Sequence, residues 1–457
     1  MNYDQGSQQR PKQDGNILSS VMSVAEFWDL SDKERNAEAN SLQTRSELEA
    51  KFQDMLILRR EEVRSQRSVS EELPSIHSGP GASSPLHASK QTIDSLLCPS
   101  YWRCLCPQLS LESDPSDALL RLYPDGVARL PSSREEQLRE EVVEEGYAIL
   151  GSKELPWCCD MNDLALGVVQ LKSFGWSPTF ICMFDEVWLV VQQLSRVLRN
   201  ALQLKLNMDF FCFYVDAFSG RGGKLAFCLF LLLPFLLFSR PNSSFIPLTK
   251  GSPGAGWPPH RDRPNSDPVT SFREDGTPKY CTVWIPFTPA TPESSCLYVV
   301  PAHADPSYRQ VRIGKDLLSS IFTSPATFQE IRALPCGPGD VVLFSHRLVH
   351  WGSRCKKTSE VPRIACSFAC SDEAFEKPYL LSKYLPLPPP AIRLALVSAQ
   401  KFAYSYQEPI VPSGMADVYL RAFLRNMEAF DPEYRQRIFA TEEVQKAALR
   451  QFSHKAL

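Results

Sequence analysis

The chain has 457 residues, fourteen cysteines and a formal net charge of −3. This length exceeds the roughly 250–300 residues that one hydrophobic core usually holds, so we expect one large domain with additions. The near-neutral charge gives no electrostatic basis for binding nucleic acid. The cysteines have no regular spacing and the polar N-terminus lacks an apolar signal region, so we expect reduced thiols and a cytoplasmic location.

The first part of the chain is predicted to lie outside the main domain. Residues 1–22 are polar, which is typical of disorder. Residues 23–64 carry apolar side chains near helical period among many charges, which predicts an amphipathic helical segment that packs on the main domain or on a protein partner. A coiled coil is the weaker alternative because sustained heptads are missing. Residues 65–95 are rich in Ser, Pro and Gly, which indicates a linker.

The main domain is expected over residues 130–375. It begins with a helix that Ser133 and Glu136 are predicted to cap and that Gly146 stops. A second amphipathic helix is predicted from about residue 185 to 202.

Short strand-like stretches separated by turn residues make up the rest of this domain. They occupy residues 147–150, 209–216, 280–287, 296–301, 340–344 and 363–370. This pattern fits an α+β fold whose core is a double-stranded β-helix, a cupin-like jelly roll with flanking helices. Residues 376–457 return to helical periodicity, so we expect a helical C-terminal extension that covers the barrel or lines its mouth.

One apolar segment does not fit this organisation. Residues 225–238 carry no charge, but these 14 residues fall short of the roughly 20 that cross a bilayer, so we predict no firm membrane span. Removing residues 224–250 would leave one Gly-rich loop between two strands, and Gly223-Lys224 can be encoded by a sequence that resembles a splice donor. We interpret 224–250 as a retained intron. A hydrophobic loop that contacts lipid or a partner and an added buried hairpin are the alternatives.

The strongest chemical signal is His260-x-Asp262, followed by a distant histidine after the strand at 340–344. Two histidines and one carboxylate hold Fe(II) on one face of an octahedron and leave three adjacent positions open. A structural zinc site would instead be closed by four ligands, usually with thiolates. His346 and His350 are four residues apart and share strand parity, so periodicity leaves both as candidates for the second histidine.

These motifs resemble the phytanoyl-CoA dioxygenase family of Fe(II)/2-oxoglutarate-dependent oxygenases. The resemblance covers about residues 134–372 and is carried by EEGYAIL, GWPPHRDRP, YCTVWIPFTPATPESSCLYVVPAHAD, GPGDVVLFSHRLVHWGS and RIACSF. It implies that His260, Asp262 and His350 are the catalytic iron ligands, because the family ligand stands six residues after the strand phenylalanine. It also implies that Arg363 binds 2-oxoglutarate and that Trp284 lies beside this cosubstrate.

By this resemblance, the protein is an oxidoreductase, a non-haem iron dioxygenase that uses Fe(II), 2-oxoglutarate and O2. It is expected to hydroxylate a small or medium-sized organic substrate and to release succinate and CO2. A coenzyme A thioester is disfavoured because no basic cluster marks a site for its nucleotide. Two departures from the family pattern are Pro301-Ala-His303 in place of Pro-Gly-Ser-His and the insert before the ligands. The alternative function is a catalytically inactive jelly-roll binding module of the same fold.

Overall fold

The structure is a computed structural model. It describes residues 84–112, 130–216, 256–263, 266–310, 317–353, 355–356, 361–385, 387–408, 410 and 414–447. The segments predicted at 1–22 and 23–64 and the proposed insert at 224–250 lie outside the described residues. Most of the predicted linker at 65–95 also lies outside them, and its last part folds into η2 and the start of α4.

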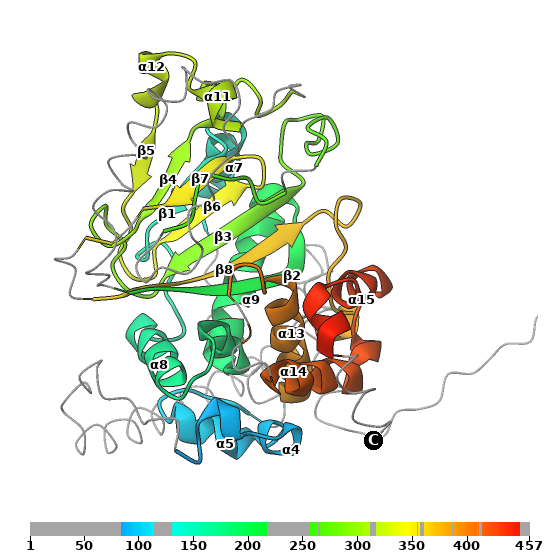
Figure 1. Cartoon of the computed structure of the whole chain (residues 1–457). Helices are drawn as coiled ribbons and strands as arrows, with labels where there is room; N and C mark the ends of the chain where they lie inside the picture. The colour runs from blue at the N-terminus through cyan, green and yellow to red at the C-terminus, as the bar shows by residue number, and fades with distance from the viewer. Residues whose placement is uncertain are drawn as a thin grey trace, which may run out of the picture.

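Two antiparallel sheets form the centre of the described part of the chain (Figure 1). Their strands are β1 (Tyr147–Leu150), β2 (Lys205–Val215), β3 (Tyr280–Pro286), β4 (Leu297–Val300), β5 (Arg332–Leu334), β6 (Val341–Ser345), β7 (Val349–Gly352) and β8 (Arg363–Ser371). The larger sheet has the order β1-β6-β3-β8-β2, and the smaller has the order β5-β4-β7. The predicted α+β class with a double-stranded β-helix core and flanking helices is confirmed.

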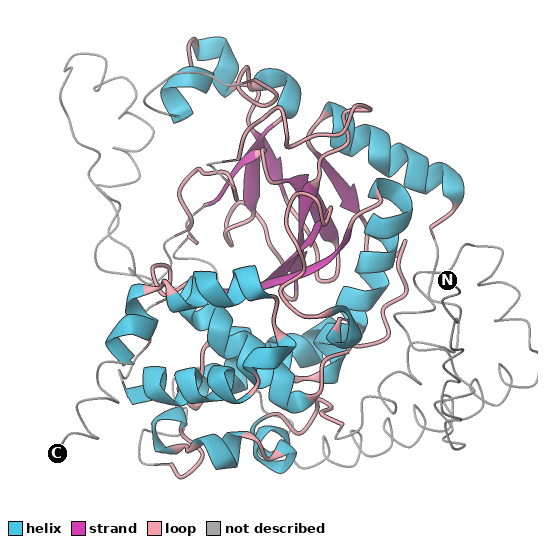
Figure 2. Ribbon diagram, turned by 90° about the vertical axis from the view of Figure 1, so that its right-hand side faces the viewer, coloured by secondary structure: helices cyan, strands magenta, loops and turns pink. Residues whose placement is uncertain are grey.

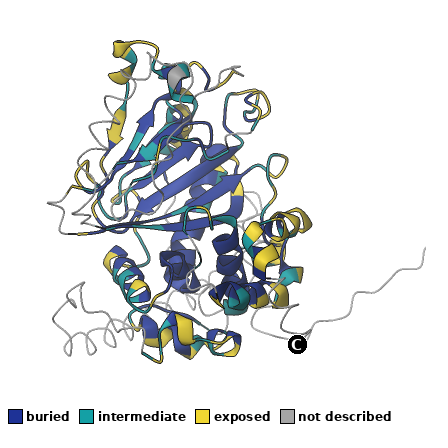
Figure 3. Ribbon diagram, in the orientation of Figure 1, coloured by how far each residue is buried: buried dark blue, intermediate teal, exposed yellow. Residues whose placement is uncertain are grey.

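The two faces of the larger sheet bury different sets of side chains, because successive residues of a strand point to opposite faces. Trp284 and Phe344 pack in one cluster with Val299 of the smaller sheet, so this cluster fills the space between the sheets. Val283 and Phe368 belong to a second cluster that they share with the helices. The central strands of the larger sheet are therefore buried on both faces, and most of this sheet is dark blue in Figure 3.

The helices gather mainly against the outer face of the larger sheet (Figure 2). The α-helices are α4 (Ile93–Leu96), α5 (Pro99–Leu105), α7 (Ser132–Glu144), α8 (Met161–Ser173), α9 (Asp185–Leu202), α11 (Leu317–Ile321), α12 (Pro325–Phe328), α13 (Pro390–Ala403), α14 (Gly414–Arg425) and α15 (Pro432–Phe439). Short 3₁₀ helices are η2 (Ala88–Lys90), η3 (Pro178–Met183), η4 (Ala302–Ala304), η5 (Ser382–Tyr384) and η6 (Met427–Ala429). Trp102 of α5 and Phe423 of α14 share one buried cluster with Phe368 of β8, so both ends of the described chain contribute to one core.

The predicted capping box at the start of α7 is wrong. The helix begins at Ser132 after Pro131, and no side chain caps it. Ser133 and Glu136 therefore both lie inside the helix, where a serine hydroxyl cannot serve as the N-cap. Gly146 ends this region as predicted, with a φ of +82° that turns the chain into β1. Among the described helices, none combines the length and apolarity that crossing a membrane requires.

Candidate metal centre

The segment that carries His260 runs antiparallel to β7. The amide of His260 donates to the carbonyl of His350 at 3.0 Å, and the amide of His350 donates back at 3.1 Å. Residues that exchange both hydrogen bonds stand directly opposite each other, so their side chains share one face. The two imidazole centroids accordingly lie 4.3 Å apart. Gly256 allows this close approach, because a Cβ there would collide with the carbonyl of Gly352.

Asp262 follows His260 by two residues, and its carboxylate lies beside both imidazoles. One ligand atom from each of His260, Asp262 and His350 lies within 4.8 Å of the others. The Oδ1 atom of Asp262 is 3.6 Å from Nε2 of His260 and 3.4 Å from Nε2 of His350. The other oxygen, Oδ2, accepts a hydrogen bond from the Thr282 hydroxyl. This hydroxyl leaves Oδ1 as the carboxylate oxygen that faces the imidazoles.

Backbone carbonyls determine which nitrogen of each imidazole is available. Nδ1 of His260 lies 2.7 Å from the carbonyl of Pro258, and Nδ1 of His350 lies 3.1 Å from the carbonyl of Leu348. A carbonyl only accepts hydrogen bonds, so each Nδ1 carries the hydrogen when the ring is neutral. Each Nε2 then presents a lone pair beside Oδ1 of Asp262. This arrangement fits a divalent cation with two imidazoles and one carboxylate on one side.

Burial and close charges perturb all three candidate ligands. Burial raises the pKa of Asp262, but the nearby imidazole of His350 outweighs this effect and holds the pKa well below its usual range. Burial lowers the pKa of His350, but the nearby carboxylate of Asp262 raises it by more than burial lowers it. The pKa of His350 is therefore raised overall. Burial and the neighbouring His350 lower the pKa of His260 to about 4. At neutral pH the site therefore holds an ionised carboxylate and a neutral His260, which are the forms that bind a metal.

His346 does not join this group. Its Nδ1 donates to the carbonyl of Tyr280 at 2.9 Å, and its ring packs 4.8 Å from that of Phe375. The side chain is fully buried, and burial lowers its pKa to about 4. Of the two candidates that periodicity could not separate, His350 is the one beside His260 and Asp262.

Arg363 begins β8 and is a buried cation with few partners. It is only 2% exposed, and its Nε and Nη1 atoms have no hydrogen-bond partner among the described residues. Its Nη2 donates to the hydroxyl of Ser295 at 3.4 Å, and its guanidinium lies 5.7 Å from the ring centroids of both Phe213 and Trp284. Burial lowers its pKa to about 10, so the side chain stays charged at neutral pH. An unpaired buried guanidinium fits the carboxylate of a small ligand.

Ser295 is a site residue that the sequence analysis missed. Its φ is +67°, in the left-handed region that favours glycine, and it is fully buried. Its hydroxyl donates to the carbonyl of Ser353, so its lone pairs face Nη2 of Arg363. Strained backbone of this kind gathers at functional sites. Thr282 was also missed, although its strand parity with Trp284 already indicated the same face.

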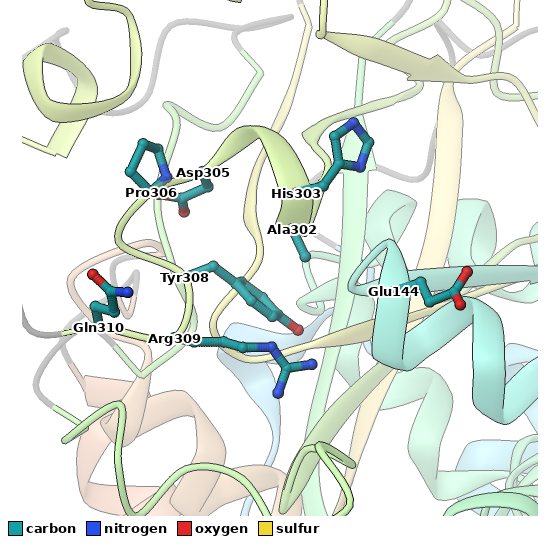
Figure 4. A pocket seen from close by; sticks show the side chains of 8 residues that line it. All are labelled: Glu144, Ala302, His303, Asp305, Pro306, Tyr308, Arg309 and Gln310. Carbon is teal, nitrogen blue, oxygen red and sulfur yellow. The ribbon is translucent and has the colours of Figure 1, made fainter.

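A pocket of about 250 Å³ lies elsewhere, against η4 (Figure 4). Glu144, His303, Tyr308 and Arg309 contribute to its lining. His303 pairs there with Glu145 at 3.3 Å, and none of the three candidate ligands lines this pocket. The pocket is therefore separate from the candidate metal centre.

Residues 237–365 match the family model of phytanoyl-CoA dioxygenase (PhyH). No curated protein sequence matches the chain.

Solved structures that resemble the chain include the epimerase SnoN in complex with Fe3+, alpha ketoglutarate and nogalamycin RO. It is 14% identical, with 53% of this chain and 85% of that chain covered and a TM-score of 0.35. EctD from S. alaskensis with 2-oxoglutarate and 5-hydroxyectoine is 14% identical, with 53% and 78% covered and a TM-score of 0.33. With scores this low, neither likeness carries an argument. The residues that match the family model of phytanoyl-CoA dioxygenase include His260, Trp284, His350 and Arg363.

Proposed function

We propose that the protein is an Fe(II)- and 2-oxoglutarate-dependent dioxygenase that oxidises a small or medium-sized organic substrate. The observation that carries this proposal is the convergence of two Nε2 lone pairs and one carboxylate oxygen near a buried, unpaired arginine. Residues 130–375 form the dioxygenase domain in this proposal, and residues 376–457 form its C-terminal extension. When bound, iron with 2-oxoglutarate and O2 supplies the oxidation of a C–H bond and the release of succinate and CO2.

The residues of the chain have separate roles in this proposal. His260, Asp262 and His350 hold the metal on one side, and the hydrogen bonds at each Nδ1 keep the ring orientations fixed. Arg363 pairs with the distal carboxylate of 2-oxoglutarate, since its Nε and Nη1 atoms have no hydrogen-bond partner among the described residues. Trp284 forms a wall beside that guanidinium.

A row of aromatic side chains near Arg363 supports the proposed class of substrate. Phe213 lies beside Arg363, and its ring centroid is 4.9 Å from that of Trp257. Phe211 continues the row, with ring centroids 6.4 Å from Trp257 and 5.1 Å from Tyr404 of the C-terminal extension. Such surfaces bind apolar or ring-bearing molecules and offer little to a phosphate-rich ligand. We therefore favour an apolar or ring-containing organic substrate over a coenzyme A thioester.

The proposal is tested by 2-oxoglutarate turnover. We expect that His260→Ala, Asp262→Ala and His350→Ala each abolish iron-dependent succinate formation, because a site with one ligand missing cannot hold the metal and cosubstrate in register. His346→Ala serves as the matched control, since this buried histidine lies outside the triad, and it should retain most of the turnover. Wild-type rates of succinate formation in the first three variants would refute the assignment of the site. Absence of iron-dependent succinate formation by the wild-type protein would refute the enzyme proposal and favour a catalytically inactive binding module.

A further inference from the structure

The loop that carries the proposed metal ligands also carries two arginines. Arg261 and Arg263 alternate with His260 and Asp262 along the sequence, and each arginine pairs with a carboxylate from another part of the chain. Nη2 of Arg261 pairs with the carboxylate of Asp305 at 2.5 Å. Residues 260–263 therefore alternate between a proposed metal ligand and an arginine that an ion pair holds in place.

Arg263, the residue after Asp262, makes more hydrogen bonds and ion pairs than Arg261. Its Nη2 donates to Oδ2 of Asp209 at 2.8 Å, and its Nε donates to Glu376 at 2.9 Å. Its guanidinium also lies 4.6 Å from the ring centroid of Tyr280. Charge-assisted bonds to two carboxylates fix both the position and the plane of this side chain.

Asp209 connects this anchor to the C-terminal extension. It lies on β2 and is 8% exposed. Its carboxylate accepts hydrogen bonds from the hydroxyls of Tyr404 at 2.7 Å and Tyr379 at 3.0 Å, and from the amide of Gln400 at 3.0 Å. Arg263 and Tyr280 also donate to it, so five donors hold one buried carboxylate, and three of them come from beyond the predicted end of the dioxygenase domain.

We propose that Asp209 is a positioning residue: through Arg263 it fixes the backbone of Asp262, and it thereby makes the C-terminal extension part of the metal site. The inference rests on the proposed function above. A buried ion pair adds little to stability compared with apolar side chains of the same volume, so stability alone does not explain this network. A network next to a ligand keeps the ligand atom in its binding position, which apolar side chains cannot do.

The test measures binding of Mn²⁺ alone to the full chain, from the EPR signal of the free ion. We expect Asp209→Asn to raise the Kd for Mn²⁺ by about tenfold or more, which is the usual effect of losing a residue that orients a metal ligand. Asp185→Asn is the matched control. Asp185 is fully buried and pairs with Arg393 at 2.6 Å, but this pair does not involve the ligand loop. The control should lower the melting temperature and leave the Kd within about twofold.

The visible spectrum of bound Co²⁺ provides a second readout, because it reports ligand geometry. It should change in Asp209→Asn and stay unchanged in Asp185→Asn. If Asp209→Asn does not fold, Arg263→Lys decides, since lysine keeps the charge and loses the planar fork. Wild-type Kd and spectrum in the folded variant would overturn the inference. If the wild-type protein itself binds no Mn²⁺, the proposed metal site fails, and this outcome is distinct from the first.

Discussion

At the scale of single residues, the candidate site consists of side chains whose hydrogen bonds leave one atom free. Nδ1 of His260 and of His350 are bonded to carbonyls, which leaves Nε2 available. Oδ2 of Asp262 is bonded to Thr282, which leaves Oδ1 available. Arg363 keeps two donors without partners among the described residues. Each group is oriented before any ligand arrives, so little ordering is needed on binding.

Arg363→Ala should weaken 2-oxoglutarate binding far more than metal binding. Loss of the guanidinium leaves a carboxylate unpaired in a buried pocket, which costs on the order of 2–5 kcal/mol, or at least about thirtyfold in affinity. The measurement is the 2-oxoglutarate dependence of succinate formation at saturating Fe(II). Arg393→Ala is the control, because Arg393 is equally buried but already paired with Asp185. An unchanged 2-oxoglutarate requirement in Arg363→Ala would assign the cosubstrate to another cation.

His346 should make the stability of the metal-free protein depend on pH. Burial lowers its pKa from 6.5 to about 4, so between these values the unfolded chain binds a proton that the folded chain does not. Stability from this group is therefore complete above about pH 6.5 and is lost as the pH falls toward 4. The loss is on the order of 3 kcal/mol.

Urea unfolding at several pH values checks this expectation. His346→Gln removes the titration and should flatten the slope of unfolding free energy against pH by up to about 1.4 kcal/mol per pH unit. His260 also has a lowered pKa and stays in the variant, so some slope should persist. An identical slope in both proteins would show that His346 is protonated in the folded state.

At the scale of elements, the long periodic segments agreed best with the sequence prediction. The helix predicted from about 185 to 202 is α9 (Asp185–Leu202), and the strand predicted at 147–150 is β1. Both patterns are strong because one whole side of each element is buried. Helix α8 was missed, although Asp160 caps it by accepting from the amide of Asn162. Strand β7 was also missed: it has four residues, like β1, but no glycine precedes it as Gly146 precedes β1.

Periodicity alone could predict only those parts of the candidate site whose residues are close together in the sequence. The spacing of His260 and Asp262 places both on one face, and this follows from the period of two. Pairing of His260 with His350 depends on register between distant segments, which no local pattern contains. The same holds for Asp209, whose partners come from three separate parts of the chain.

Deleting the chain after Asp372 should abolish cooperative folding. Leu394 and Phe402 of α13 and Phe423 of α14 are buried in the cluster that covers β8, so their loss exposes the outer face of the larger sheet. Circular dichroism melting should show a broad transition without a defined midpoint. Removing only residues 448–457 is the control and should keep the wild-type transition. A sharp melt in the truncated protein would show that the domain folds without its extension.

At the scale of the whole molecule, residues 224–250 are the segment whose removal is most informative. The chain on either side of it is held together, since the Phe213 ring lies 4.9 Å from that of Trp257. A shorter connection can therefore join β2 to the ligand loop. We expect protein without 224–250 to keep the wild-type melting temperature and Mn²⁺ affinity.

Sequencing of the cDNA across this region tests the interpretation as a retained intron. Transcripts without the codons for residues 224–250 support the retained-intron interpretation. Abundant transcripts that contain these codons contradict it. The two experiments are independent, because a loop can be dispensable for folding and still be translated.

The unpaired guanidinium of Arg363 affects how the protein selects among ligands. Two of its nitrogen atoms have no hydrogen-bond partner among the described residues, which raises the free energy of the ligand-free state, and a carboxylate that reaches them removes this penalty. Arg363 lies on β8 and the proposed ligand His350 lies on β7, which exchanges two hydrogen bonds with the segment of His260. A dicarboxylate can contact both the metal and the guanidinium only if its two carboxylates are the right distance apart. Across a homologous series of dicarboxylates, the increase in the melting temperature of the protein should therefore be largest at one chain length and smaller for shorter and longer members.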